Sequence, residues 1–406
     1  MDFMSTKANA KNNLLLIVIS YMAFISLGLP DGLLGVSWPF ISQRHNVPLD
    51  SLGILLISFV AGYLVTSTTS GKILTKISMG LLLTLSCFVT GLSLMAFAFS
   101  DYWVLVIAAS FFLGSGGGAI DTSINVFAAS RFSASVVNWL HAFYGIGATS
   151  GPFIITWMIV QDKGWYNGYI VVGIIQITLS LIFLLTVKYW KVTSGHGEPQ
   201  STGSYAEAFR LPMVWINILI FFLYSGLEIG VGQWIFTVLT KSRGIDAAQA
   251  GLWTSAYWGS LTAGRIIFGF ILTKLSVHRV LVGAFTGVVI GSLLLLINYN
   301  DLLNLTGIIL IGFANAPIFP CLISITPKQV GEKYSASIIG FQISGAMIGG
   351  AILPAFAGLL TGYFGWEVIP FTFLVEAILL LTLYMISSGR IGKSKLLRKA
   401  DKNVHR

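Results

Sequence analysis

Apolar stretches long enough to cross a lipid bilayer recur from one end of the chain to the other. A helix needs about 20 apolar residues to span the hydrocarbon core, and inside a bilayer every backbone polar group must find its partner within the protein. Hydrophobic residues make up 55% of the 406 residues and charged residues only 10%, whereas a soluble domain carries about 25% charged residues. The sequence therefore predicts an all-α membrane protein.

We expect twelve transmembrane helices, arranged as an N-terminal six-helix half (1–188), a linker (189–211), a C-terminal six-helix half (212–389) and a basic tail (390–406). The linker is predicted from its polar composition, rich in Ser, Gly, Glu, Pro and Thr. The ranges predicted for the spans are 13–36, 51–71, 78–98, 103–128, 136–160, 166–188, 212–236, 248–272, 278–297, 303–324, 336–360 and 366–387.

The distribution of basic residues predicts the orientation. With the N-terminus in the cytoplasm, 19 of the 24 Lys and Arg residues fall in cytoplasmic segments and four in the opposite loops. Cytoplasmic loops of membrane proteins carry such an excess, so we expect a multi-pass plasma-membrane protein with both termini in the cytoplasm. The net charge of +9 then indicates contact between the basic tail and anionic lipid, not nucleic-acid binding.

The two halves repeat one another. Gly71–Ser78 (GKILTKIS) aligns with Gly269–Ser276 (GFILTKLS) at an offset of 198 residues. At an offset of 197, Asp31 of the first span falls on Glu228 of the seventh. Two pseudo-symmetric halves of this kind usually hold a binding site between them, near the bilayer midplane.

Asp31 lies inside the first predicted span, between Pro30 and Gly32. A carboxylate in a span costs roughly 2.5–3.5 kcal/mol on insertion scales and usually marks a function. The alternative is that Asp31 lies at the aqueous end of the span and only caps it. We favour a functional role because a second carboxylate, Asp121, lies in the fourth span with similar polar neighbours.

Asp121 and Asn125 are four residues apart, so they share one face of the fourth helix. The glycine-rich run Gly114–Gly118 before them is not a phosphate loop, because no Lys-Ser/Thr follows it. We interpret it as a set of small residues that lets the first and fourth helices approach closely. Cys87 and Cys321 both fall in apolar runs and suggest neither a disulfide nor a metal site.

Glu228 is followed within two turns by Gln233 and Trp234. A carboxylate, an amide and an indole together can bind sugar hydroxyls and stack on a pyranose ring. The alternative is a packing Glu and a Trp at the membrane interface. Arg265 is the only basic residue within a span, and we expect it to snorkel to the cytoplasmic surface or to clamp a gate.

The two six-helix halves, the central linker and the Gly-x-x-x-polar-Lys turns after spans two and eight resemble the major facilitator superfamily. Thr75 and Thr273 stand where that family's turn usually carries an acidic residue. Several stretches are similar to the fucose-permease and sodium-glucose-transporter-like sugar symporters: Gly118–Asn125, Asn138–Gly145, Tyr224–Glu228, Tyr257–Gly259, Leu261–Arg265 and Ala316–Pro320.

This resemblance implies roles for particular residues. Fucose permease has acidic residues at the places that match spans one and four, which implies coupling and sugar contact here. Its sugar-contacting amides match His141 and Tyr144, so the particular sugar is left open. The predicted coupling residues are Asp31, Asp121 and Glu228; Arg265 is assigned to a gate or to structure; the predicted substrate-binding residues are Asn125, Asn138, His141, Tyr144, Gln233, Trp234, Trp253, Tyr257, Asn315 and Gln342.

We therefore expect a monomeric secondary transporter, not an enzyme, that imports a neutral sugar or related polyol by H⁺ or Na⁺ symport through alternating access. It needs no cofactor beyond the coupling ion. The alternative is a proton-coupled efflux antiporter for drugs or other amphipathic small molecules, because Gly147-x-x-x-Gly151-Pro152 resembles the antiporter signature. Phe153, Ile154 and Ile155 follow, where that signature has two further glycines. A sensor that binds its ligand without moving it is a third reading.

Overall fold

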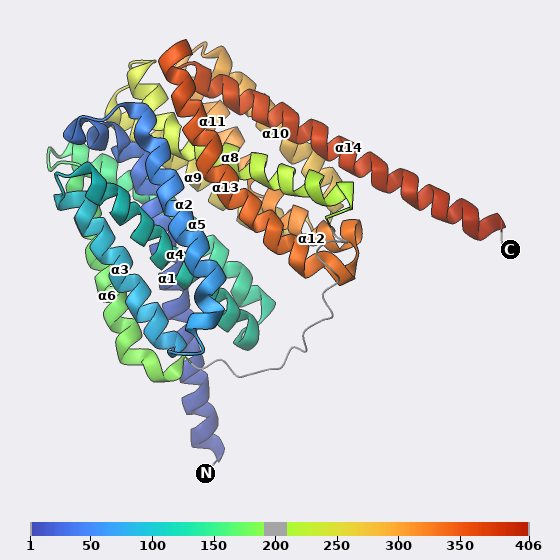
Figure 1. Ribbon diagram of the computed structural model, residues 1–406, viewed down its shortest axis with the longest axis horizontal. Helices are drawn as coiled ribbons and strands as arrows, with labels where there is room; N and C mark the ends of the chain where they lie inside the picture. Colours follow the sequence, from blue (N-terminus) through green and yellow to red (C-terminus); the bar gives the residue numbers. More distant parts are fainter. Residues whose placement is uncertain (1, 191–208, 405–406) are drawn as a thin grey trace.

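The computed structural model describes residues 2–190 and 209–404, and it is helical throughout these ranges (Figure 1). Most of the predicted linker (189–211) lies outside the described residues, and no side chain of the predicted tail (390–406) is described. The N-terminal half contains α1 (Asp2–His45), η1 (Leu49–Ser51), α2 (Leu52–Ile73), α3 (Met79–Phe99), α4 (Trp103–Arg131), α5 (Ala134–Val160), α6 (Tyr166–Thr186) and η2 (Val187–Tyr189). The C-terminal half contains α8 (Pro212–Lys241), α9 (Ala247–Ile271), α10 (Val277–Ile297), α11 (Asp301–Asn315), α12 (Ile318–Val330), α13 (Glu332–Phe364) and α14 (Val368–Val404).

The predicted twelve-helix membrane fold is confirmed. Within the described ranges, eleven segments are long and apolar enough to cross a membrane. The twelfth crossing is α9, whose apolar character is diluted by Arg265 and by several Ser, Thr and Tyr residues. Helices α11 and α12 together make one span, Asp301–Val330. They are separated at Pro317, which has no backbone N–H with which to continue the α11 ladder.

Helix α1 is longer than the sequence predicted, and this settles where Asp31 lies. The predicted span ended at residue 36, but the helix continues through Pro30 and Pro39 to His45. Prolines are tolerated in membrane helices because neighbouring groups satisfy the freed carbonyls. The apolar segment runs from Asn13 to His45, so Asp31 lies 18 residues from one end and 14 from the other. The interpretation of Asp31 as a cap at the aqueous end is therefore wrong.

The bundle has two distinguishable ends. We call the end at which α6 finishes and α8 begins the linker end, and the opposite end, at which α1 and α8 finish, the far end. Within the first half, α1 packs on α5, α2 on α4 and α3 on α6. Across the two halves, α5 packs on α9, α2 on α13 and α1 on α8, so the halves lie side by side (Figure 1).

Small residues bring the two halves together on the far-end side of the bundle. A Cβ atom added to Gly35 of α1 would lie 2.3 Å from the carbonyl oxygen of Gly232 in α8. One added to Gly53, at the start of α2, would lie 2.4 Å from the Cβ of Ala355 in α13. Such contacts leave no room for water between the backbones, so the far end is closed in this conformation.

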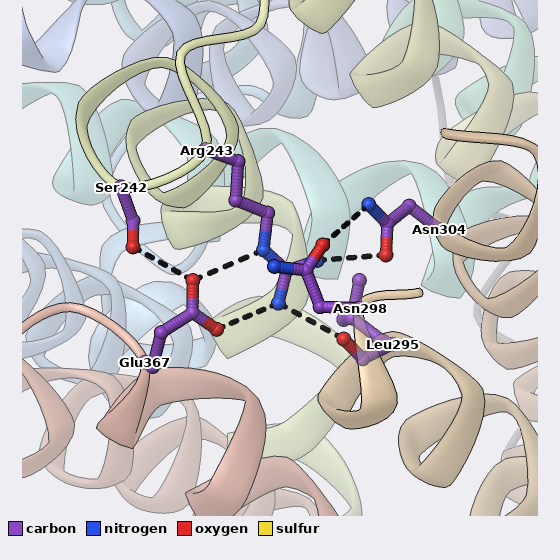
Figure 2. Close-up of polar contacts among 6 residues, drawn as sticks. All are labelled: Ser242, Arg243, Leu295, Asn298, Asn304 and Glu367. Carbon is purple, nitrogen blue, oxygen red and sulfur yellow. Dashed lines mark hydrogen bonds and ion pairs between the residues drawn. The ribbon is translucent and has the colours of Figure 1, made fainter. Parts of the chain in front are cut away.

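Figure 2 shows an arginine clasp that fastens the far end of the C-terminal half. Arg243 follows α8, and its side chain is only 3% exposed. Its Nε and Nη2 donate to the carboxylate of Glu367 at 3.1 and 2.8 Å, and Nη1 donates to Asn304 Oδ1 at 2.9 Å. Nη2 also donates to the carbonyl of Leu295 at 2.9 Å. One side chain thus ties together the ends of α8, α10, α11 and α14.

A matching clasp fastens the far end of the N-terminal half. Arg44, near the end of α1, donates to Asp101 at 2.8 Å and to the carbonyl of Ala98 at 2.7 Å. Its guanidinium carbon lies 5.9 Å from the ring centre of Trp165. In both halves the arginine lies at or just after the end of the first helix and donates to a carbonyl near the end of the third. Each half is therefore fastened within itself at the end where the two halves meet.

Candidate functional site

Asp31 of α1 is paired with Tyr144 of α5. The hydroxyl of Tyr144 donates a hydrogen bond to Asp31 Oδ2. Gln233 of the other half donates from Nε2 to the backbone carbonyl of Asp31 at 3.1 Å. The first predicted carboxylate therefore lies at the seam between the halves, with its own side chain turned to a tyrosine.

Asp121 of α4 has an equivalent arrangement. The hydroxyl of Tyr63 in α2 donates to Asp121 Oδ2 at 2.5 Å. Asn125 donates from Nδ2 to Asp121 Oδ1 at 2.8 Å, as the four-residue spacing predicted. The charges of Asp121 and Asp31 are near enough to repel one another. The two aspartates therefore belong to one site, although each is held by a different neighbouring helix.

Glycines explain why each tyrosine can reach its aspartate. A Cβ added to Gly28, three residues before Asp31, would lie 2.1 Å from the backbone oxygen of Tyr144. One added to Gly118, three residues before Asp121, would lie 2.6 Å from the backbone oxygen of Tyr63. The absence of a side chain at each glycine lets the helix that carries the tyrosine lie directly against the helix that carries the acid.

The predicted contact of the Gly114–Gly118 run was wrong. We expected these glycines to bring α4 against α1, but their close approaches are to α2 and α3, and Gly117 faces α1 only at ordinary contact distance, with an added Cβ 3.8 Å from Leu27. A Cβ at Gly114 would lie 1.9 Å from the oxygen of Phe59 in α2, and one at Gly116 would lie 2.4 Å from Thr90 in α3. The run of small residues predicted a close approach correctly, but it could not say which helix approaches.

Glu228 of α8 is the carboxylate contributed by the C-terminal half. The hydroxyl of Tyr224, one turn earlier, donates to Glu228 Oε2. Arg265 of α9 lies 3.5 Å from Oε1, and the side chains of the pair are 21% and 10% exposed. Tyr257 of α9 donates to the backbone carbonyl of Glu228 at 2.7 Å. Glu228 is thus the carboxylate of the three that has an arginine beside it.

Arg265 connects the two halves at the site. Its guanidinium carbon lies 5.9 Å from the ring centre of Tyr144, and Tyr144 in turn donates to Asp31. Of the two roles expected for Arg265, snorkelling to the surface is wrong, because the side chain turns to Glu228 instead; a role in a gate or in structure stays a prediction. The charge of Arg265 offsets part of the desolvation cost of Glu228. Asp31, Asp121 and Glu228 are called the acidic cluster below.

Two more predicted residues, His141 and Asn138, belong to α5. His141 is exposed. It packs edge-on against Phe24 of α1 and lies within electrostatic range of Asp121 and Arg265. It therefore lies on the linker-end side of the acidic cluster and is accessible to solvent. The side chain of Asn138 lies outside the part of the chain that the structure describes.

Four other predicted residues are buried in the C-terminal half. Trp234 is fully buried and donates from Nε1 to the carbonyl of Pro354 at 2.8 Å, on the side of α8 that packs on α13. Gln342 is paired with Thr326 at 3.1 Å between α12 and α13. Asn315 and Trp253 are also buried. The structure therefore does not bring Trp234 or Gln342 to the acidic cluster by any contact we observe.

Sequence reasoning missed two tyrosines of the site. Tyr63 carries the hydroxyl on Asp121, and nothing in its local sequence predicts this contact because the partner is 58 residues away. Tyr224 was part of a stretch similar to the sugar symporters but was not chosen as a site residue. Its four-residue spacing to Glu228 is the signal that would have found it.

Comparison with known proteins gives this geometry a context. The chain is 24% identical over 354 residues to the glucose/mannose transporter GlcP of Bacillus subtilis (strain 168), covering 84% of this chain and 86% of GlcP. It is 23% identical over 382 residues to sodium-dependent glucose transporter 1A of Mus musculus, covering 85% and 89%.

Solved structures show the same fold. The nucleoside transporter NupG superposes with a TM-score of 0.78 at 14% identity, over 92% of this chain and 99% of NupG. The fucose:proton symporter FucP of E. coli superposes with a TM-score of 0.62 at 17% identity, over 92% and 98%. The family model described as Major Facilitator Superfamily matches residues 16–242 and 233–402. The chain belongs to the major facilitator superfamily.

Proposed function

We propose that the protein is a secondary active transporter that imports a neutral sugar or a related polyol together with H⁺ or Na⁺. The observation that carries the proposal is the acidic cluster, in which three membrane-spanning helices, α1, α4 and α8, each contribute a carboxyl group and Asp31 lies within electrostatic range of the other two. Two of them are held by tyrosine hydroxyls from neighbouring helices. The names of GlcP and of the mouse glucose transporter support a sugar as the substrate class.

The ion would bind at the two aspartates of the N-terminal half. Among the described residues, Asp31 and Asp121 receive hydrogen bonds from uncharged donors, whereas Glu228 already lies beside Arg265. Moving an uncompensated carboxylate through the hydrocarbon region is expensive. A proton or a sodium ion at Asp31 or Asp121 would remove that cost and allow the halves to reorient. Glu228, with Arg265 and Tyr257, would hold substrate hydroxyls.

The conformation fits one step of alternating access. The far end is closed by backbone contacts between the halves, such as Gly35 against Gly232, while His141 is exposed within the bundle. If both termini lie in the cytoplasm, as the basic residues predict, the site is open towards the cytoplasm. The halves would then rock about the acidic cluster to open the far end.

Thermal stability of the purified protein across a panel of sugars tests this proposal. Each sugar is added with and without Na⁺ over a series of pH values, because a ligand that binds the folded state raises the unfolding temperature. We expect stabilisation by a neutral sugar that depends on Na⁺ or on pH. Stabilisation by no sugar or polyol under any of these conditions would contradict the proposal.

A proton-coupled efflux antiporter is the second candidate, and the packing of α5 favours it in one respect. A Cβ at Gly147 would lie 2.0 Å from the oxygen of Ile25, and one at Gly151 would lie 2.6 Å from the oxygen of Leu29. The glycines that resemble the antiporter signature therefore seat α5 directly on the stretch of α1 that precedes Asp31. The same stability assay distinguishes the candidates when amphipathic cations replace sugars in the panel.

A further inference from the structure

Two buried polar atoms on the far-end side of the acidic cluster have no hydrogen-bond partner. They are the Oε1 atom of Gln233 and the Nε1 atom of Trp258. The residues are 4% and 1% exposed. A buried donor or acceptor left without a partner costs about 1–3 kcal/mol. Gln233 Oε1 is a hydrogen-bond acceptor, and Trp258 Nε1 is a donor.

Trp258 differs from the other tryptophans that are equally buried. Four tryptophans are less than 2% exposed among the described residues. An indole N–H normally finds an acceptor when it is buried, and three of these do: Trp38 donates to the carbonyl of Leu49, Trp190 to the hydroxyl of Thr186 and Trp234 to the carbonyl of Pro354. The unpartnered N–H of Trp258 is therefore an exception within this protein.

Gln233 lies at the seam between α1 and α8, and Trp258 of α9 packs on the residue of α8 that precedes it. The ring of Trp258 packs on Gly232, where an added Cβ would lie 2.9 Å from Cε2, the ring carbon bonded to Nε1. A Cβ added to Gly35 of the other half would lie 2.3 Å from the carbonyl oxygen of Gly232. Gln233, the next residue, reaches across the seam to the carbonyl of Asp31 at 3.1 Å. Any separation of α1 from α8 at the far end would uncover this region first.

We propose that Trp258 Nε1 and Gln233 Oε1 form a donor–acceptor pair for a hydroxyl group of the substrate. The pair is masked while the far end is closed and is presented when the halves part there. A hydroxyl group can accept from the indole N–H and donate to the amide oxygen at the same time. The inference rests on the proposed function, because it assumes a hydroxyl-rich substrate, and it assigns a binding role to Trp258, a residue outside the predicted site.

Replacement of Trp258 by Phe tests the inference. Trp258→Phe keeps an aromatic ring on Gly232 and removes the N–H. The matched control is Trp190→Phe, which removes a buried indole N–H near the linker end. Binding of D-glucose and of its monodeoxy analogues is measured by the stability assay and by calorimetry on each purified protein.

We expect Trp258→Phe to weaken glucose binding about 10-fold or more, the effect of one lost hydrogen bond of about 1.4 kcal/mol. It should leave unchanged the affinity of the one deoxy analogue that lacks the contacted hydroxyl. Trp190→Phe should bind every sugar as the wild type does. If Trp258→Phe does not fold, Gln233→Met replaces it in the same comparison; this variant removes the amide oxygen at similar volume, and with it the Nε2 donor to the Asp31 carbonyl.

The outcomes separate the two proposals. Wild-type affinity of the Trp258→Phe protein for all the sugars would overturn the inference and leave the proposed function intact. An equal loss of affinity for glucose and for every deoxy analogue would also overturn it, because it would indicate a general packing effect. Absence of sugar binding by the wild-type protein would overturn the proposed function, and the hydroxyl-binding pair with it.

Discussion

The close approach of α1 and α5 at Gly28 predicts a large effect of a single methyl group. In Gly28→Ala the new Cβ would lie 2.1 Å from the backbone oxygen of Tyr144 and 2.7 Å from the backbone nitrogen of Ala148. Contacts of a real Cβ stay above 3.0 Å, so the two backbones must separate by 0.9 Å. Both obstructing atoms are main-chain atoms, so no side-chain rotation can relieve the contact. The Tyr144 hydrogen bond to Asp31 lies on the same pair of helices and is strained with it.

The magnitude follows from two opposing terms. Overpacking a well-packed site costs about 1–3 kcal/mol, and Ala in place of Gly returns up to about 1 kcal/mol of helix propensity. Because both obstructing atoms at Gly28 are main-chain atoms, we place Gly28→Ala at the upper end of the overpacking range and expect a net destabilisation of about 2 kcal/mol. Gly118→Ala needs a separation of only 0.4 Å from the oxygen of Tyr63 and should cost less. Gly283→Ala, in α10, meets no atom within 4 Å and should be neutral or stabilising.

Thermal unfolding followed with a thiol-reactive fluorophore measures this series. Cys87 and Cys321 are both free and buried, so the dye reacts as the protein opens. The expected order of unfolding temperature is Gly283→Ala at or above the wild type, then Gly118→Ala, then Gly28→Ala, lower by several degrees. A Gly28→Ala protein as stable as Gly283→Ala would refute the account of how α1 and α5 are held together.

Two further predictions concern the charged groups. Burial acts to raise the pKa of Glu367, but the hydrogen bonds and the ion pair that Glu367 makes with Arg243 outweigh burial and lower this pKa. The ionised carboxylate therefore stabilises the fold above about pH 4.3, the usual pKa of Glu. This stabilisation is lost as the pH falls through the lowered pKa. Glu367→Gln should accordingly reduce the unfolding temperature at pH 7 more than Asp101→Asn does, because Asp101 is 80% exposed. The difference in unfolding temperature between Glu367→Gln and the wild type should shrink when the melts are repeated at pH values down to 3. Arg265→Gln leaves Glu228 without its cation in a buried site. The Arg265→Gln protein should therefore be less stable than the Arg265→Gln/Glu228→Gln double variant. A thermal double-mutant cycle in which the double variant is the less stable of the two would contradict the pairing.

Much of the fold followed from the sequence because membrane helices are specified locally. Each apolar run of about 20 residues predicts its own span, and the repeat at offsets near 198 predicted the two halves. The alignment of Asp31 with Glu228 predicted that both acids lie at the seam. The error was at the end of α1, where the predicted span ended at residue 36 although the helix continues through Pro39 to His45.

The candidate site was predictable where its contacts are local. The shared helix face of Asp121 and Asn125 depends only on helical spacing and was predicted, although their hydrogen bond was not. The contacts of Asp121 with Tyr63 and of Arg265 with Glu228 join residues 58 and 37 positions apart. They depend on which helices are neighbours and on how deep each side chain lies, and neither property can be obtained from the periodicity of a single span.

Ion-driven sugar uptake into proteoliposomes tests the central claim most directly. The wild-type protein, Asp31→Asn and Asp121→Asn are reconstituted, and accumulation of the sugar identified by the stability assay is followed under an imposed H⁺ or Na⁺ gradient. Asp101→Asn, whose carboxylate is exposed at the far end, is the control. We predict that ion-dependent accumulation is lost in Asp31→Asn, in Asp121→Asn or in both, and is kept in the control. Intact ion dependence in both aspartate variants would contradict the claim that the acidic cluster couples the ion to transport.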